Sequence, residues 1–178
     1  MARDITSDFN TAIKDTVVQP IFAIELEFSD GTLRFWTGYG DITMTAGGSS
    51  KTFTGTGDLL TISPIGESST LQMQGITVAL TGIKSSLIST ALTAQYTNRN
   101  GTLYMGLLNS SGAVIADVYT LFKGKMDVLN INEGAETSTI TLKIESRLVS
   151  FDLPLNRMYT LEDQQVDYST DLGFEFIS

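Results

Sequence analysis

The sequence contains no cysteine and no histidine among its 178 residues. Without cysteine the chain forms no disulfide and offers no thiolate as a nucleophile or metal ligand. Without histidine it lacks the side chain that titrates near neutral pH, the most common metal ligand and the usual general base of a serine or cysteine triad. We therefore expect a protein that is not an enzyme and that has no catalytic, cofactor or metal site.

Long apolar runs and basic residues are also scarce. No run reaches the roughly 18 apolar residues that span a membrane, and the first residues lack the order of a secretory signal peptide. Eleven Lys and Arg stand against 20 Asp and Glu, so the net charge of −9 argues against nucleic-acid readout. Apolar residues make up 42% of the chain, which is typical of a globular domain. We expect no membrane insertion and synthesis in a cytoplasm.

The charges are unevenly distributed along the chain. Between residues 68 and 126 the only acid is Asp117, against the bases Lys84, Arg99, Lys123 and Lys125. From residue 152 onward there are six acids and a single base, Arg157. This asymmetry lets an acidic tail contact a mildly basic surface on a neighbouring copy, and a solvated acidic surface is the alternative interpretation.

Short runs of β-branched and aromatic residues, separated by Gly, Asn, Asp and Ser clusters, predict a strand-rich fold. Alternation of polar and apolar residues from Ser138 onward is the clearest strand signal, and a strand over residues 71–80 contains Gly75 as a candidate bulge. The Asp30-Gly31 pair predicts a tight hairpin turn with positive φ at both positions. The predicted hairpins join residues 21–28 to 32–37, 42–45 to 51–54, 103–108 to 113–122, and 125–131 to 137–145.

Helix signals are fewer. Ser7 is a candidate cap for a helix over residues 8–15, a second short helix is expected over residues 85–94, and Thr160 with Asp163 resembles a capping box that starts one helical turn. The predicted fold class is mainly β, a β-barrel or β-sandwich with two or three short helices. We expect a single domain over residues 1–178, with residues 1–18 as an N-terminal helical arm and residues 157–178 as a C-terminal docking segment.

Three patterns resemble functional sites, and each also has a purely structural interpretation. Gly55-Thr56-Gly57-Asp58 begins like a dinucleotide loop but lacks the third glycine, which favours a tight turn. The run from Trp36 to Asp41 combines two aromatics with two glycines. This combination fits either a sugar-binding platform or core packing beside a turn.

The third pattern is a series of acids at four-residue spacing: Asp163, Asp167, Asp171 and Glu175. One continuous helix would align them as a cation site, but Gly173 argues against that helix and favours a solvated acidic edge. A carboxylate pair alone suffices for glycoside hydrolysis, and nothing in the sequence marks such a pair.

The C-terminal region also carries a family resemblance. The run Arg157-Met158-Tyr159-Thr160-Leu161-Glu162-Asp163-Gln164-Gln165, followed by Tyr168 and by Asp171-Leu172-Gly173-Phe174-Glu175-Phe176, resembles the tail-tip or baseplate hub proteins of long-tailed bacteriophages and gene transfer agents. Upstream pieces in a similar order extend the resemblance over most of residues 21–176, although those pieces are generic for β proteins.

The resemblance implies a structural subunit of the virion, in a ring that joins the end of the tail tube to the central tip or fibre protein. It implies a homo-oligomer with threefold or sixfold symmetry, assembled in the host cytoplasm, with the distal tail protein and the tape measure protein as further partners. The candidate interface residues are Arg157, Tyr159, Glu162, Asp163, Gln164, Tyr168, Asp171, Phe174 and Phe176.

Two alternative functions remain open. A distal tail or tail tube protein of the same machine has a similar composition, and ring symmetry separates the two, with sixfold symmetry favouring the tube side and threefold symmetry the hub. A carbohydrate-binding module that uses Trp36 and Tyr39 belongs to a different class.

Overall fold

The fold is known from a computed structural model, which describes residues 5–56, 60–66, 74–81, 94–115, 117–133, 138–151 and 158–176. The chain divides into two compact units, Met1–Arg147 and Leu148–Ser178. Strands make up 52% of the described residues, which otherwise contain two short α-helices and one 3-10 helix. The prediction of a mainly β chain with few short helices is therefore confirmed.

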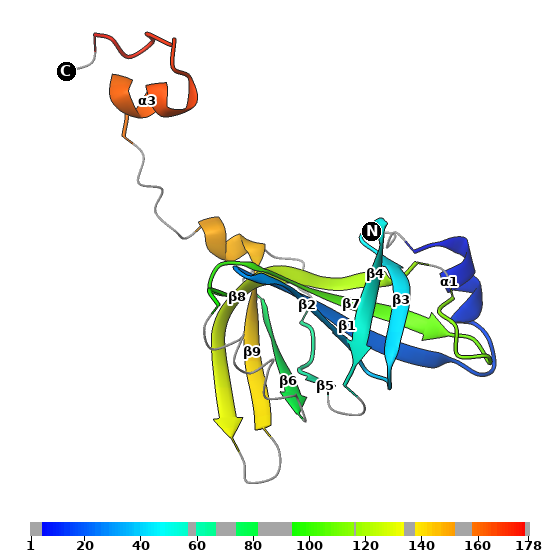
Figure 1. Cartoon of the computed structure of the whole chain (residues 1–178). Helices are drawn as coiled ribbons and strands as arrows, with labels where there is room; N and C mark the ends of the chain where they lie inside the picture. The colour runs from blue at the N-terminus through cyan, green and yellow to red at the C-terminus, as the bar shows by residue number, and fades with distance from the viewer. Residues whose placement is uncertain are drawn as a thin grey trace. The chain divides into compact units, whose positions relative to one another are not determined.

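Nine strands of the first unit form one mixed sheet in the order β3-β4-β2-β1-β7-β8-β9-β6-β5 (Figure 1). Every neighbouring pair is antiparallel except β2 and β4. Within the described residues β3 and β5 end this order without pairing to each other, so a sandwich-like arrangement fits and the alternative of a closed barrel is wrong. The strands are β1 Gln19–Phe28, β2 Gly31–Trp36, β3 Asp41–Ala46, β4 Ser49–Gly55, β5 Leu60–Ile62, β6 Gly75–Thr81, β7 Asn100–Leu108, β8 Tyr119–Glu133 and β9 Ser138–Ser146.

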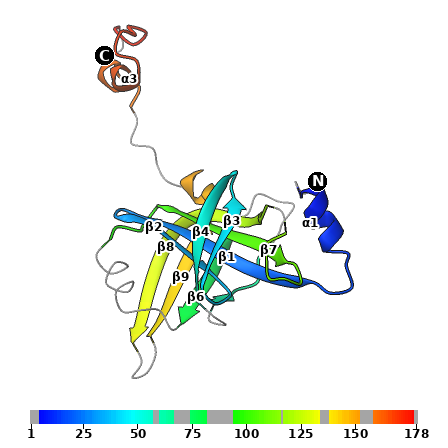
Figure 2. The same ribbon diagram turned by 45° about the vertical axis from the view of Figure 1, so that its right-hand side comes forward.

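Strand β1 is buried on both faces, because its alternating side chains enter two different clusters. Ile24 and Leu26 join the larger cluster, together with side chains of β6, β8 and β9. Ile21 and Ala23 point the other way, into a smaller cluster that includes Phe53 of β4. The β3–β4 hairpin therefore covers one face of β1, and it lies over β1 in both views of the chain (Figures 1 and 2).

The first two predicted hairpins are confirmed, with one correction. Phe28 lies opposite Gly31, so the turn begins at Ser29 as predicted, but it ends at Asp30, one residue earlier than predicted, because Gly31 already belongs to β2. Asp30 does not have positive φ, whereas Gly31 begins β2 at φ 148°, a conformation that favours glycine. In the second hairpin Gly47 and Gly48 both have positive φ, at 62° and 79°, as a tight two-residue turn requires.

The third hairpin differs from the prediction on its returning side. Val114 bridges back to β7 at Leu108 and the Ile115 backbone donates to the Leu107 carbonyl at 2.8 Å, but the next regular strand among the described residues starts at Tyr119 instead of Ala113. The Asn109 side-chain oxygen accepts hydrogen bonds from the backbone of Ser111 and Ala113, which holds these residues in a loop. Strand β8 then continues to Glu133, so the runs predicted as separate strands over residues 113–122 and 125–131 belong in large part to one strand.

Strand β9 confirms the clearest strand prediction, because its apolar residues Ile140, Leu142 and Ile144 are buried. Strand β6 begins at Gly75, which is therefore the first residue of a strand and not a bulge inside one. The earlier part of that predicted strand, residues 71–73, lies outside the described residues. The short strand β5 was not predicted.

The helices follow the capping signals. Helix α1, Ser7–Ala12, begins one residue before the predicted start, because Thr6 rather than Ser7 is its cap and accepts a hydrogen bond from the Phe9 backbone. Helix α3, Leu161–Asp167, is capped by Thr160 as predicted and extends over about two turns instead of one. The 3-10 helix η1 is Arg147–Phe151. The helix predicted over residues 85–94 lies outside the described residues except for Ala94.

Candidate functional site

The candidate interface segment forms a small folded unit around α3. The Thr160 hydroxyl accepts a hydrogen bond from the Asp163 backbone at 3.3 Å, which satisfies a donor that the first helical turn leaves unpaired. The Asp163 carboxylate in turn accepts from the Met158 backbone at 3.3 Å. This reciprocal pattern fixes the direction in which the chain enters the helix, and it needs only the short polar side chains that the sequence supplies.

After α3 the chain turns back along the helix, and Asp171 holds this turn. Its two carboxylate oxygens accept hydrogen bonds from Gln164 Nε2 at 2.5 Å and from the Gly173 backbone at 2.8 Å. Its backbone carbonyl accepts a weaker hydrogen bond from Gln165 Nε2 at 3.5 Å. Asp171 therefore binds both the helix and the returning segment, which closes residues 158–176 into a loop. These polar contacts hold the unit together, since no residue of α3 is buried.

Aromatic side chains line a groove in this unit. The rings of Tyr159 and Phe174 meet edge to face, with centroids 6.1 Å apart and planes at 90°. Together with Tyr168 they border a groove of about 600 Å³. Tyr159 is 83% exposed and Tyr168 is 67% exposed, so most of both rings contacts solvent. The lining residues are Met158, Tyr159, Asp163, Gln164, Asp167, Tyr168, Asp171 and Phe174.

The structure brings together six of the nine predicted interface residues in this groove. Glu162 and Phe176 belong to the same unit but do not line the groove, and Arg157 lies outside the described residues. Met158 and Asp167 line the groove and were not predicted as interface residues. Met158 lies within the run that carries the family resemblance, and Asp167 belongs to the four-residue acidic series, so both signals were present in the sequence.

The acidic series is not one continuous face of a helix. Helix α3 ends at Asp167, and Asp171 follows in the returning segment, where it serves as a hydrogen-bond acceptor within the unit. No group of three or more acidic side chains close enough to hold a metal ion occurs in the part of the chain that the structure describes.

The aromatic run after β2 has a structural role. Trp36 is only 8% exposed, and its indole N–H donates to the Gly40 carbonyl at 2.9 Å. Its ring packs against Gly38, where any side chain would collide with it. Tyr39 is exposed, but the buried Trp36 cannot form the second half of a stacking platform for a sugar. Gly55 ends β4, and a side chain there would collide with the Gly38 backbone, while Gly57 and Asp58 lie outside the described residues.

A buried charge cluster lies beneath the β3–β4 hairpin. Glu25 is 7% exposed and forms ion pairs with Arg34 at 2.7 Å and Lys51 at 2.9 Å. Burial raises the pKa of Glu25, but the hydrogen bonds and positive charges of Arg34 and Lys51 outweigh this effect and hold the pKa below its ordinary value. Burial, reinforced by the nearby Glu25 carboxylate, raises the pKa of Tyr104. These contacts join three strands, which indicates a structural role.

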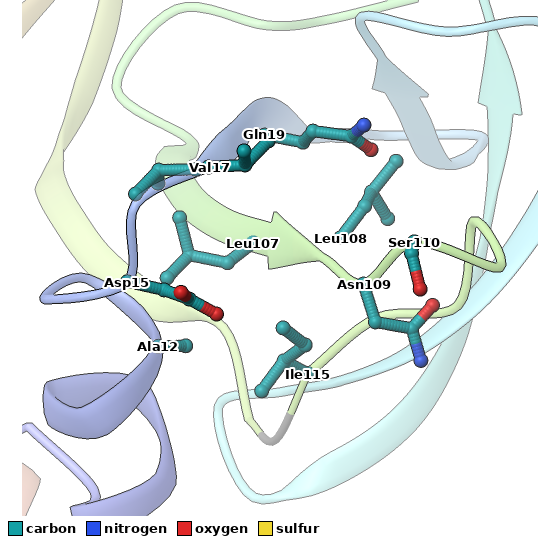
Figure 3. Close-up of a pocket in the computed structure, with 10 residues that line it drawn as sticks. Ala12, Asp15, Val17, Gln19, Leu107, Leu108, Asn109, Ser110 and Ile115 are labelled. Carbon is teal, nitrogen blue, oxygen red and sulfur yellow. The ribbon is translucent and has the colours of Figure 1, made fainter.

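A second groove, of about 250 Å³, lies between the segment after α1 and the end of β7 (Figure 3). Its walls carry apolar side chains such as Val17, Leu107 and Leu108, and Asp15 is the only ionisable residue among those that line it. The groove therefore offers apolar contact without a set of groups that could carry out a reaction.

No model of a known protein family matches the sequence, and no curated protein matches it either.

Each described helix is too short to cross a membrane.

Proposed function

We propose that this chain is a structural, non-enzymatic subunit of a bacteriophage tail tip, in the hub ring that joins the tail tube end to the central tip or fibre. In this role the β-rich first unit supplies the wall of the ring, and the C-terminal unit docks onto a neighbouring protein. The proposal places the chain in the virion, as a homo-oligomer that also contacts the distal tail and tape measure proteins.

The distribution of exposed apolar side chains carries the proposal. Thirteen large apolar side chains are exposed in the described residues, and seven of them belong to the much smaller second unit. Exposed apolar groups gathered in one place mark interaction surfaces in soluble proteins. Those of the second unit are Phe151, Met158, Tyr159, Val166, Tyr168, Leu172 and Phe176.

Helix α3 gives a second reason to expect docking. An isolated helix shorter than about 12 residues is marginal in water, and most helices in proteins gain stability from packing an apolar face. Helix α3 has seven residues and none of them is buried, whereas α1 buries Phe9. We therefore expect α3 to gain its packing from a partner.

The open sheet agrees with an assembly role. Among the described strands β3 and β5 have one unpaired edge each, and such edges must be paired, covered or blunted to prevent uncontrolled association. A ring of identical subunits covers edges and apolar surfaces by closed symmetry.

Gold-labelled antibodies against the purified chain, applied to tailed particles from the source strain, test this function. We expect label at the tail tip. Label along the whole tube would favour the tail tube alternative, and particles without label would contradict the proposal. Particles from a strain that lacks the gene serve as the control for non-specific labelling.

The symmetry of the ring distinguishes the hub from the distal tail ring. Image averaging of the labelled tips is expected to show threefold symmetry for the layer that contains this chain. A sixfold layer would instead assign the chain to the distal tail or tube side.

A further inference from the structure

The groove of the C-terminal unit has the chemistry of a receptor for a basic side chain. Tyr159, Tyr168 and Phe174 provide aromatic faces, which attract cations. From residue 148 onward there are six acids and one base, which gives the unit a net charge of −5. A purely apolar ligand would gain nothing from this negative charge, whereas a basic ligand would be attracted by it.

Two lysines on β8 match this groove in charge. Lys123 and Lys125 alternate along the strand, so they project from the same face of the sheet, opposite Thr102 and Asn100 of β7. Lys123 is exposed and Lys125 is partly exposed. Neither forms an ion pair within the described part of the chain.

Other basic side chains of the sheet are already engaged. Glu25 binds Arg34 and Lys51, and Lys143 binds Glu145 at 2.7 Å. On the face that carries the two β8 lysines, the neighbouring acid Glu145 is therefore bound to Lys143. The pair formed by Lys123 and Lys125, here called the β8 lysine pair, keeps its positive charge for a partner.

We propose that the groove of one copy binds the β8 lysine pair of a second copy. This inference rests on the proposed function, because it names the partner surface of the same C-terminal unit. Each copy supplies one groove and one lysine pair, so the contact is head to tail and repeats from copy to copy. Such a contact closes into a ring when the rotation per subunit divides a full turn.

Two single substitutions in the full-length chain test this contact. Tyr168→Lys removes an aromatic wall and places a cation in the groove, and a lysine at this end of α3 is favourable for the helix dipole. Its matched control is Thr170→Lys, because Thr170 is exposed, does not line the groove and is not one of the exposed apolar side chains of the unit. Lys123→Glu reverses the partner charge, and Lys14→Glu, at an exposed position beyond α1, is its control.

Sedimentation velocity gives the association state of each protein. We expect the wild type and both controls to self-associate, more weakly at high salt because ionic contacts are screened. Tyr168→Lys and Lys123→Glu should each lower the self-association constant at least about tenfold. Circular dichroism of each variant establishes that its fold is retained.

Mixing the two variants distinguishes a second copy from other occupants. The groove of Lys123→Glu and the lysine pair of Tyr168→Lys are both intact, so the mixture should form one-to-one heterodimers and nothing larger. A mixture that stays monomeric, with the wild type either associated or monomeric, would overturn the inference and point to the chain's own sheet or to a different protein as the occupant. Self-association of both variants at the wild-type level would also overturn it.

These outcomes are separable from those of the labelling experiment. Label at the tail tip together with a monomeric mixture would leave the structural function standing and reject only the second copy as partner. Heterodimers together with unlabelled particles would reject the phage role and leave the self-contact standing.

Discussion

Glu25 on β1 and Lys51 on β4 form a salt bridge of 2.9 Å although they are 26 positions apart in the sequence. Lys51 also lies 5.9 Å from the centre of the Tyr104 ring, which places its charge over an aromatic face. Because Arg34 binds the same carboxylate, Glu25 connects β2 and the β3–β4 hairpin to β1. This cluster fixes the position of the hairpin over β1.

Glu25→Gln should lower the free energy of unfolding by about 2 kcal/mol, because two partly buried cations, Arg34 and Lys51, lose their charged partner. Glu27→Gln is the matched control, since the partner of Glu27 within the described residues is the neutral amide of Asn100, at 2.7 Å, and the substitution should cost less than about 1 kcal/mol. Urea denaturation measures both. Equal losses for the two variants would contradict the proposed role of the cluster.

The same carboxylate predicts a dependence of stability on pH. The pKa of Glu25 is held below its ordinary value of 4.5, so the folded state binds this proton more weakly than the unfolded state does. The contribution to stability is complete above pH 4.5 and is lost as the pH falls through the folded-state pKa. The acid decline of the midpoint urea concentration should therefore be shallower in Glu25→Gln than in the wild type.

Gly124 and Gly75 both lie beside Glu145 of β9, but the fold should respond differently to a methyl group added at each position. A side chain at Gly124 would collide with the Glu145 carbonyl, whereas one at Gly75 would make an ordinary contact at 3.4 Å with the Ile144 carbonyl. Gly124→Ala should destabilise the fold by about 3 kcal/mol, and Gly75→Ala by less than about 1 kcal/mol. Thermal unfolding of both variants checks this, and a Gly124→Ala protein as stable as the wild type would contradict the register of β8 and β9.

The cap of α3 gives a prediction specific to the second unit. Thr160→Ala removes the oxygen that accepts from the Asp163 backbone and should destabilise α3 by about 1 kcal/mol. Thr160→Ser keeps that oxygen and is the control. Amide hydrogen exchange of residues 161–167 should be faster in the alanine variant alone, and unchanged protection there would mean that Thr160 does not cap the helix.

The sequence predicted those elements whose signals are local. The alternation from Ser138 onward and the Gly47-Gly48 turn each depend on a few adjacent residues, and the structure has β9 and the second hairpin at those places. The start of β8 was not predicted, because residues 113–115 pair, among the described residues, only with the last residues of β7 around the Asn109 loop, and the Val118 backbone then donates to Thr45 of β3.

The candidate site shows the same division between local and distant contacts. The Thr160 cap and the clustering of Tyr159 with Phe174 arise within one 20-residue segment, so a sequence motif could point to them. The Glu25 cluster was not predicted, because its partners come together only through strand register and the position of the β3–β4 hairpin. What binds the groove could not be predicted from this segment, because the proposed partner surface, the β8 lysine pair, lies elsewhere in the sequence.

Truncation after residue 156 tests the central claim, that the C-terminal unit carries assembly while the β-rich unit folds by itself. We expect the truncated chain to keep the far-ultraviolet circular dichroism of a β protein and a cooperative unfolding transition. We expect it to be monomeric by light scattering at concentrations where the full chain associates. A truncated chain that folds and associates as the full chain does would contradict the claim.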